Sequence, residues 1–265
     1  MKKYLVIGNP IEHSLSPKLH NYWLKKNNIE AIYERKKIFE SDLNDLILEV
    51  KREKISGINV TVPFKRTAIS FLDELTSEAD KTKSVNTIYL RNKKIIGHNT
   101  DIEGFEKSVK FQEFNLKNQK ILILGAGGVV PSIIFALLKM GVQKITVSNR
   151  TTEKALDLKK LFKDIDIVDW GKEIEFDMVI NATSLGLQKN DKINLEFLKE
   201  KKNKFFYDVI YNPIETQFLK RAKELGNNVE NGKMMFIHQA AAAFKIWHNI
   251  EPEINEELIE YLLND

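Results

Sequence analysis

The fold is decided by residues 120–151, which read KILILGAGGVVPSIIFALLKMGVQKITVSNRT. The apolar run at 121–124 predicts a buried strand, and the apolar residues after Pro131 predict a helix. Gly125-x-Gly127 lies between them. In this context the first glycine permits a tight turn, the second lets a pyrophosphate approach the backbone, and the helix amino terminus supplies unpaired amides. The stretch therefore predicts a dinucleotide-binding unit.

The same stretch carries no charge from Ile121 to Leu138, a length that a membrane span also requires. The glycine turn and Pro131 interrupt this run, and its periodicity changes from that of a strand to that of a helix. We therefore expect a buried strand, turn and helix, and no membrane partner. The apolar run at residues 4–7 is too short for an export signal, so a cytoplasmic protein is expected.

Selectivity between the two nicotinamide dinucleotides is set at the end of the next strand. Residues 148–151 read SNRT there, with no acidic residue to hold the ribose hydroxyls of NAD. Arg150 can pair with a 2′-phosphate instead, and Lys154 follows one helical turn later. NADP is therefore favoured. A structural glycine turn beside a chance arginine is the alternative, and the place of the glycines between a strand and a helix argues against it.

Composition describes an ordinary globular chain and removes several functions. The 265 residues, 43% hydrophobic and 29% charged, suffice for one large domain or two modest ones. A net charge of +4, from 41 Lys and Arg against 37 Asp and Glu, is far from that of a nucleic-acid-binding arm, so no nucleic-acid partner is expected. The absence of cysteine excludes disulfides, thiolate metal sites and a cysteine nucleophile.

Strand patterns alternate with helix patterns along the chain, which favours mainly parallel α/β sheets. Strands are expected at 4–7, 31–38, 57–62, 121–124, 144–148, 178–181 and 205–210, helices at 17–27, 42–52, 236–247 and 254–263, and a hairpin over 86–97 that turns at Asn92. The segment 101–114 is expected to connect two α/β series.

Candidate chemistry lies in polar stretches that follow predicted strands. Lys65 and Asp101 each occupy such a position and could form an acid/base pair, although isolated ions of this kind are more often surface residues. Ser14 and Ser16 alternate ahead of Pro17, so that both hydroxyls could face one side of an extended segment and bind a carboxylate. The alternative is that Ser16 only caps the helix that Pro17 starts.

A series of motifs resembles those of one enzyme family, the shikimate dehydrogenases. The motifs follow the family's order along nearly the whole chain: Gly8-Asn9-Pro10, Ser14-Leu15-Ser16-Pro17, residues 57–65 (GINVTVPFK), Ser84-Val85-Asn86-Thr87, residues 99–105 (NTDIEGF), Gly125-Ala126-Gly127-Gly128, Asn149-Arg150-Thr151, residues 208–213 (DVIYNP) and His238-Gln239-Ala240-Ala241. The resemblance implies reversible, NADP-linked reduction of 3-dehydroshikimate to shikimate in chorismate and aromatic amino-acid biosynthesis.

The resemblance also implies a domain organisation. It implies two α/β domains with the active site in the cleft between them. Residues 1–103 plus 237–265 would form a substrate-binding catalytic domain with a mainly parallel sheet, and residues 104–236 a Rossmann-like NADP-binding domain. The chain would act as a monomer or homodimer on a small-molecule substrate.

Site residues follow from the same resemblance. Lys65 and Asp101 would be the catalytic pair. The substrate would be bound by Ser14, Ser16, Thr61, Asn86, Tyr211 and Gln239, with Asp101 also holding a ring hydroxyl. The cofactor would be bound by Gly125, Ala126, Gly127, Gly128, Val129, Asn149, Arg150, Thr151, Lys154, Ile210, Gly232 and Met235. No metal is expected, since the five histidines show no ligand spacing.

Two departures from the family pattern concern the cofactor. Val129-Val130-Pro131 replaces small residues after the glycine turn, and residues 231–235 read NGKMM where the family usually has NGLGM. Two alternatives stay open. One is a quinate/shikimate dehydrogenase that uses NAD, for which an acidic residue near Arg150 would be the signal. The other is a non-catalytic dinucleotide-binding regulator, against which the presence of both Lys65 and Asp101 argues.

Overall fold

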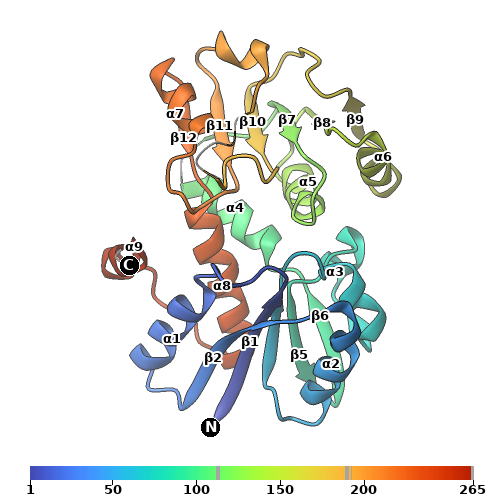
Figure 1. Ribbon diagram of the computed structural model, residues 1–265, viewed down its shortest axis with the longest axis vertical. Coiled ribbons are helices and arrows are strands. Elements are labelled where there is room, and N and C mark those ends of the chain that lie inside the picture. Colours follow the sequence, from blue (N-terminus) through green and yellow to red (C-terminus); the bar gives the residue numbers. More distant parts are fainter. Residues whose placement is uncertain (112–113, 189–190, 192, 264–265) are drawn as a thin grey trace. The chain divides into compact units, whose positions relative to one another are not determined.

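The computed structural model describes residues 1–111, 114–188, 191 and 193–263. These residues divide into two compact units (Figure 1). The first unit comprises residues 1–104 and 237–265, and the second comprises residues 105–236. Each unit contains one six-stranded sheet.

The sheet of the first unit is mixed, with the strand order β2-β1-β3-β5-β6-β4. Its strands are β1 (Lys2–Gly8), β2 (Ala31–Lys37), β3 (Gly57–Val60), β4 (Glu74–Leu75), β5 (Thr87–Arg91) and β6 (Lys94–His98). The pairs β1·β2, β1·β3 and β4·β6 are parallel, while β5 is antiparallel to both β3 and β6. The β5–β6 hairpin turns at Asn92 and Lys93, whose φ values of 52° and 63° suit the tight turn that matches strand twist.

Helices from both ends of the chain complete the first unit. They are α1 (Ser16–Lys26), α2 (Leu43–Lys51), α3 (Ser77–Thr82) and α9 (Glu256–Leu263), with short 3-10 turns η1 (Glu40–Asp42) and η2 (Thr67–Phe71). Two further helices, α4 (Asp101–Phe111) and α8 (Lys233–His248), have residues in both units. The core is built from apolar side chains of β1, α2, β3 and β5, including Leu5, Ile47, Ile58 and Ile88. Burial of each such side chain stabilises the fold by about 1.5–3 kcal/mol.

The carboxyl-terminal segment packs on the first unit's sheet. The Trp247 indole fills the space beside Gly57, where a Cβ would lie 2.3 Å from Nε1, and that nitrogen donates a hydrogen bond to the Ile88 carbonyl at 3.2 Å. Trp23 Nε1 donates to the Glu253 carbonyl at 2.9 Å. Residues after 237 are therefore an integral part of the first unit.

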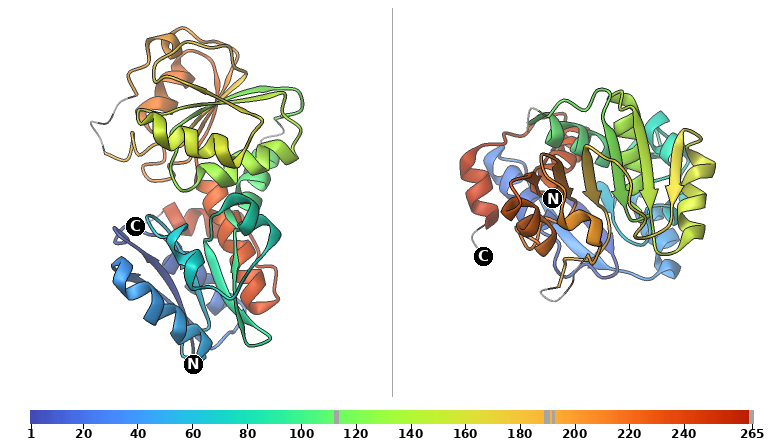
Figure 2. Two further views of the ribbon diagram at one scale, coloured as in Figure 1. Left: turned by 90° about the vertical axis from the view of Figure 1, so that its right-hand side faces the viewer. Right: turned by 90° about the horizontal axis from the view of Figure 1, so that it is seen from above.

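The sheet of the second unit is parallel throughout, with the order β12-β11-β10-β7-β8-β9 (Figure 2, right). Its strands are β7 (Lys120–Leu124), β8 (Lys144–Ser148), β9 (Ile165–Val168), β10 (Met178–Asn181), β11 (Phe205–Asp208) and β12 (Asn228–Glu230), and its other elements are α5 (Val130–Lys139), α6 (Thr152–Leu161), η3 (Glu196–Lys199) and α7 (Gln217–Glu224). The strand order changes direction at β7, which makes the carboxyl ends of β7 and β10 a topological switch point, the usual ligand site of such sheets.

Most predicted elements are confirmed within one or two residues. The charge-free run 121–138 is β7, a turn and most of α5, and no helix among the described residues is long and apolar enough to cross a membrane. The strand expected at 57–62 ends at Val60, and the helix expected from Pro17 begins at Ser16. The short strands β4, β9 and β12 were not predicted, because two to four residues with polar members carry little periodicity. Residues 112–113 of the expected connecting segment 101–114 lie outside the described residues.

Candidate active site

A largely buried ion pair joins two residues of the first unit. Lys65 lies in the turn after β3, and Asp101 is the first residue of α4. Lys65 Nζ is 2.5 Å from Asp101 Oδ2, and the two side chains are only 12% and 8% exposed. In such a low-dielectric place the attraction between the charges is strong, and the ammonium is held in one orientation. The pair predicted from the sequence is therefore brought together by the fold.

Asn86 joins this pair to the closing helix of the unit. Its Nδ2 donates to Asp101 Oδ1 and Thr100 Oγ1, both at 2.9 Å, and approaches Gln239 Oε1 at 3.4 Å. Its Oδ1 accepts from the Thr100 amide at 2.8 Å. The side chain is 3% exposed. Four predicted site residues, Lys65, Asn86, Asp101 and Gln239, thus belong to one hydrogen-bonded network.

The network extends through residues that were not predicted as site residues. The Tyr33 hydroxyl donates to Asn59 Oδ1 at 2.6 Å, and Asn59 Nδ2 donates to the Asn86 carbonyl at 3.0 Å and to Thr87 Oγ1 at 3.1 Å. Every residue of β3 is buried, Asn59 included. A polar side chain inside a wholly buried strand needs a partner, so this pattern was the signal that could have found it.

The serine segment differs from the extended conformation that was expected. Leu15 has φ −84° and ψ −1°, which is helical backbone, and the Ser16 amide donates to Ser14 Oγ at 3.3 Å. The side chain of the residue before α1 makes no cap, and Ser16 itself is the buried first residue of the helix. Its hydroxyl forms a hydrogen bond with Tyr33 instead. A turn closed by Ser14 therefore replaces the extended segment.

The loop with Ser14 and the start of α1 with Ser16 follow β1, and the loop with Thr61 follows the neighbouring parallel strand β3. The Thr61 amide donates a hydrogen bond to the Ile7 carbonyl at 2.9 Å. A Cβ on Gly8 would lie only 2.5 Å from the methyl carbon of Thr61. Glycine is thus required at position 8 for the two loops to approach. Because the carboxyl ends of parallel strands share one edge of a sheet, the backbone that carries these three residues follows that edge.

The glycine turn of the second unit has the geometry of a phosphate site. Gly125 has φ +110°, and a Cβ there would lie 2.7 Å from the Ala182 carbonyl oxygen. A Cβ on Gly127 would meet only that oxygen, at 3.8 Å, so space is left beside the turn. Helix α5 begins at Val130 with Pro131 in its first turn and without a side-chain cap. The amino end of α5 is thus left to attract an anion.

The residues predicted to select NADP follow β8, whose last residue pairs in register with the last residue of β7. Asn149 Nδ2 donates to the Thr151 carbonyl at 2.7 Å and shapes this loop. Arg150, Thr151 and Lys154 are exposed at the start of α6, which also begins without a side-chain cap. The cationic side chains of Arg150 and Lys154 are therefore exposed to solvent after β8, the strand next to β7 and its glycine turn.

Of the remaining predicted residues of the second unit, Ile210, Tyr211 and Gly232 lie in the loops after β11 and β12, and Met235 lies in the first turn of α8. Ile210 is buried, and its carbonyl accepts from the Gly232 amide at 3.1 Å. A Cβ on Gly232 would lie 2.1 Å from the Val209 carbonyl oxygen, so only glycine fits. Met235 is buried, and the Tyr211 ring stacks on Phe236 with centroids 4.6 Å apart.

Sequence reasoning missed a buried carboxylate between these loops. Asp208 ends β11, and burial raises its pKa to about 6. Its Oδ1 accepts from Asn181 Nδ2 and from the Ile210 amide, both at 3.0 Å, and its Oδ2 accepts from the Thr216 hydroxyl at 2.7 Å. The signal was available, since both Asp208 and Asn181 are the single polar residues that end otherwise apolar buried strands.

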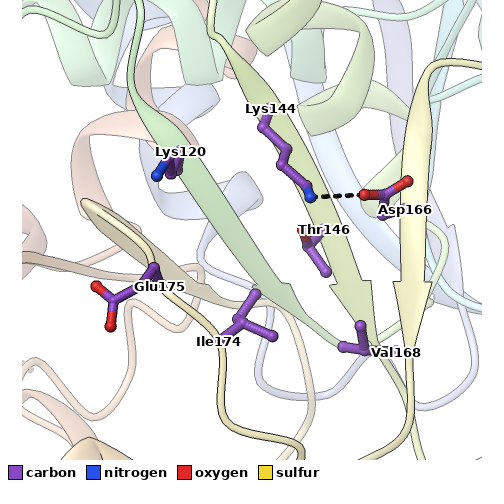
Figure 3. Close-up of a pocket in the computed structure, with 7 residues that line it drawn as sticks. All are labelled: Lys120, Lys144, Thr146, Asp166, Val168, Ile174 and Glu175. Carbon is purple, nitrogen blue, oxygen red and sulfur yellow. Dashed lines mark ion pairs between the residues drawn. The ribbon is translucent and has the colours of Figure 1, made fainter.

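A separate hollow of about 170 Å³ lies on the same sheet (Figure 3). Among its lining residues, Lys120 and Lys144 begin β7 and β8, at the ends opposite the glycine turn. Lys144 forms an ion pair with Asp166 at 2.8 Å. Ligands of parallel sheets bind at the carboxyl ends of strands, so this hollow is not a candidate site. The described residues also contain no cluster of His, Cys, Asp or Glu suited to a metal ion.

The second unit has a parallel sheet with a glycine turn at its switch point, and the first unit has the lysine–aspartate pair. Together these two features define a nicotinamide-dependent oxidoreductase. Family models match both units: "Shikimate dehydrogenase substrate binding domain" matches residues 6–88, and "Shikimate / quinate 5-dehydrogenase" matches residues 107–228. The chain belongs to the shikimate dehydrogenase family.

Relatives agree with this assignment. The chain is 60% identical over 261 residues to the shikimate dehydrogenase (NADP(+)) of Pelagibacter ubique, covering 98% of each chain. Among solved structures, shikimate dehydrogenase from Aquifex aeolicus has a TM-score of 0.91 at 36% identity, covering 100% of this chain and 98% of that one. Shikimate 5-dehydrogenase from Thermus thermophilus, in complex with NADP(H) and shikimate, has a TM-score of 0.89 at 33% identity, covering 99% of each.

Proposed function

We propose that this protein is a shikimate dehydrogenase that reversibly reduces 3-dehydroshikimate to shikimate with NADPH, in the biosynthesis of chorismate and the aromatic amino acids. The observation that carries the proposal is the buried Lys65–Asp101 pair, hydrogen-bonded through Asn86 to Gln239. It is supported by 60% identity over nearly the full chain to a shikimate dehydrogenase (NADP(+)).

Substrate binding is assigned to residues 1–103 with 237–265. A substrate with one carboxylate and three ring oxygens needs several convergent polar groups, because each one left unpaired on burial costs about 1–3 kcal/mol. The hydroxyls of Ser14 and Ser16 are assigned to the carboxylate. The ring oxygens are assigned to Thr61, Asn86, Asp101 and Gln239, and Tyr211 is also assigned to the substrate.

Proton transfer is assigned to Lys65. In the reduction, its Nζ gives a proton to the oxygen of the carbonyl that becomes a hydroxyl, and in the oxidation the neutral amine takes that proton back. Asp101 keeps the ammonium oriented and stabilises its charge, since its Oδ2 lies 2.5 Å away while Oδ1 is held by Asn86. NADPH, when bound, supplies the hydride.

Cofactor binding is assigned to residues 104–236. The turn Gly125–Val129 and the uncapped start of α5 suit the pyrophosphate. Arg150 suits the 2′-phosphate as a charged, bidentate partner, with Asn149, Thr151 and Lys154 beside it. Ile210, Gly232 and Met235 are assigned to the nicotinamide.

A matrix of substrates and cofactors tests this function. The purified full chain is mixed with shikimate or quinate and with NADP or NAD, and absorbance of the reduced nicotinamide is followed. We expect turnover with shikimate and NADP to be the fastest of the four. Quinate is included because one matching family model is named for both shikimate and quinate. A preference for quinate with NAD would establish a quinate/shikimate dehydrogenase that uses NAD. Binding of NADP without turnover of either acid would establish a regulator.

We further propose that the enzyme works in the cytoplasm as a monomer or homodimer and without nucleic acid. The nearly balanced charge of 41 basic and 37 acidic residues supports the last point. Light scattering of the purified chain measures the mass of the particle, and fractionation of cells locates the activity. A larger assembly, or activity in a membrane or exported fraction, would contradict the proposal.

A further inference from the structure

Asp208 is a fully buried carboxylate that the reaction itself does not use. We propose that Asp208 is a positioning residue for the nicotinamide half of NADP, because it holds together the loops that carry Ile210 and Gly232. The inference rests on the proposed function, since it presumes that these loops receive the nicotinamide.

Both oxygens of the Asp208 carboxylate are engaged. A buried carboxylate is costly unless donors replace its water, and here three groups do so: the Asn181 amide, the Ile210 backbone amide and the Thr216 hydroxyl, at 3.0, 3.0 and 2.7 Å. These donors come from the last residue of β10, from the loop after β11 and from the residue before α7. One side chain therefore ties three segments together.

Asn181 passes this constraint to the loop after β10. Its Nδ2 donates to the Leu185 carbonyl at 3.1 Å as well as to Asp208, while its Oδ1 accepts from the Thr183 amide and hydroxyl at 3.1 and 2.7 Å. The Leu185 amide in turn donates to Thr183 Oγ1 at 3.0 Å. The Asn181 side chain therefore holds the loop in one conformation. Asp208 fixes the orientation of the Asn181 amide, because Nδ2 must face the carboxylate, which leaves Oδ1 for Thr183.

Backbone contacts carry the constraint to both neighbouring loops. A Cβ on Gly125 would lie only 2.7 Å from the Ala182 carbonyl oxygen, so this loop lies against the glycine turn. On the other side, the Ile210 carbonyl accepts from the Gly232 amide at 3.1 Å. A shift of Asp208 would therefore move the backbone at Ile210 and Gly232.

Among the described residues, the direct and indirect contacts of Asp208 involve the strands from β12 to β7 and not β8 or β9. In the order β12-β11-β10-β7-β8-β9, its partners end β10 or follow β11, and its indirect contacts reach the loop after β12 and the turn after β7. Arg150, assigned to the 2′-phosphate, follows β8 on the other side of β7. Loss of Asp208 should therefore affect the nicotinamide half of the cofactor and spare the adenosine half.

Calorimetric titration of the full-length chain separates the two halves. NADP and adenosine 2′,5′-bisphosphate are titrated into the wild type and into Asp208→Ala. We expect Asp208→Ala to raise Kd for NADP at least tenfold and to leave Kd for the bisphosphate within twofold. Asp208→Asn should keep Kd for NADP within about threefold of wild type, because its amide oxygen can accept from Asn181 and Ile210 while its nitrogen donates to Thr216.

Asp177→Ala is the matched control. Asp177 lies just before β10, at the opposite end of the same sheet, and its carboxylate accepts from the Lys120 amide at 2.9 Å. Both ligands should bind this variant as they bind wild type. If Asp208→Ala does not fold, Thr216→Val removes one of the three donors, and we expect it to raise Kd for NADP about threefold or more with the bisphosphate unchanged.

Two results would overturn the inference alone: equal weakening of both ligands by Asp208→Ala, which would mean a general loss of structure, or no weakening of NADP. A wild-type chain that binds neither ligand would overturn the proposed function and this inference with it. The two failures are therefore distinguished by the wild-type titration.

Discussion

Lys65 and Asp101 lie 36 positions apart in the chain, yet their charged atoms approach to 2.5 Å inside one unit. The pair forms because the turn after β3 and the start of α4 are both fixed by backbone bonds, including one from the Val85 amide to the Lys65 carbonyl at 2.8 Å. The ammonium therefore reaches a carboxylate that is itself held by Asn86, and it is oriented before any substrate binds.

Lys65→Ala should lower kcat by about 100- to 10,000-fold, the range that a positioned proton donor contributes, with a smaller change in KM for shikimate. Steady-state kinetics with NADP check this. Lys51→Ala removes a lysine whose ion pair with Asp73 is largely exposed, and it should leave kcat unchanged. If kcat of Lys65→Ala equalled that of wild type, the lysine would have no part in proton transfer.

Arg150→Ala should raise KM for NADP about 10- to 100-fold, because a charge-assisted hydrogen bond contributes about 1.5–3 kcal/mol. KM for NAD, which has no 2′-phosphate, should change little. Lys160→Ala, on the same helix α6 but paired with Asp157 at 2.9 Å, should change neither. Equal losses for both dinucleotides would remove Arg150 from the selection of NADP.

Two glycine substitutions should separate fold from cofactor. Gly232→Ala places a Cβ 2.1 Å from a carbonyl oxygen and should destabilise the protein by about 1–3 kcal/mol. Gly127→Ala meets nothing closer than 3.8 Å and should leave the melting temperature nearly unchanged while weakening NADP about tenfold or more, since its methyl group occupies the space beside the turn. Thermal unfolding and NADP titration measure both. Normal NADP binding by Gly127→Ala would place the pyrophosphate elsewhere.

His20 should make the protein sensitive to acid. Its ring is buried and stacks on Tyr33 with centroids 4.1 Å apart, and burial lowers its pKa to about 3 from an ordinary value near 6.5. Between these values the unfolded chain binds a proton that the folded chain does not. Stability from this group is therefore complete above pH 6.5 and falls as the pH drops, by up to about 4 kcal/mol near pH 3.

His20→Phe keeps the stacked ring but cannot be protonated. As the pH falls from 6.5 to 4, the unfolding free energy of wild type should decrease more than that of the variant. Denaturant unfolding at several pH values measures it. His13→Gln, at an exposed histidine, is the control and should show no such shift. Parallel curves for wild type and His20→Phe would show that His20 is not the source of the acid sensitivity.

Local signals in the sequence predicted the local parts of the fold. The β5–β6 hairpin at Asn92, the strand β10 and the strand–turn–helix at Gly125 each depend on neighbouring residues, and all three are confirmed. The extended segment expected at Ser14 and Ser16 was wrong, because the helical backbone of Leu15 places Ser16 inside α1. Alternation of two serines could not reveal this.

In the candidate site, the hydrogen-bond partners that come from distant segments could not be predicted from the sequence. The bond from Tyr33 to Asn59 spans 26 positions, and the bond from Asn181 to Asp208 spans 27. Asn59, Asn181 and Asp208 each lie in a wholly buried strand, so each needs a partner, but only the pairing of strands decides which one. Resemblance to a family supplied Lys65 and Asp101 as a pair, which position alone left open.

The return of residues 237–265 to the first unit has a consequence for synthesis on the ribosome. Trp247 fills the space at Gly57 and bonds to Ile88, so the first unit lacks part of its interior until residues 237–265 have emerged. Residues 105–236 are complete before that point. Residues 1–104, although translated before 105–236, therefore finish folding after them, and until then the nascent chain exposes the apolar surface that α8 will cover.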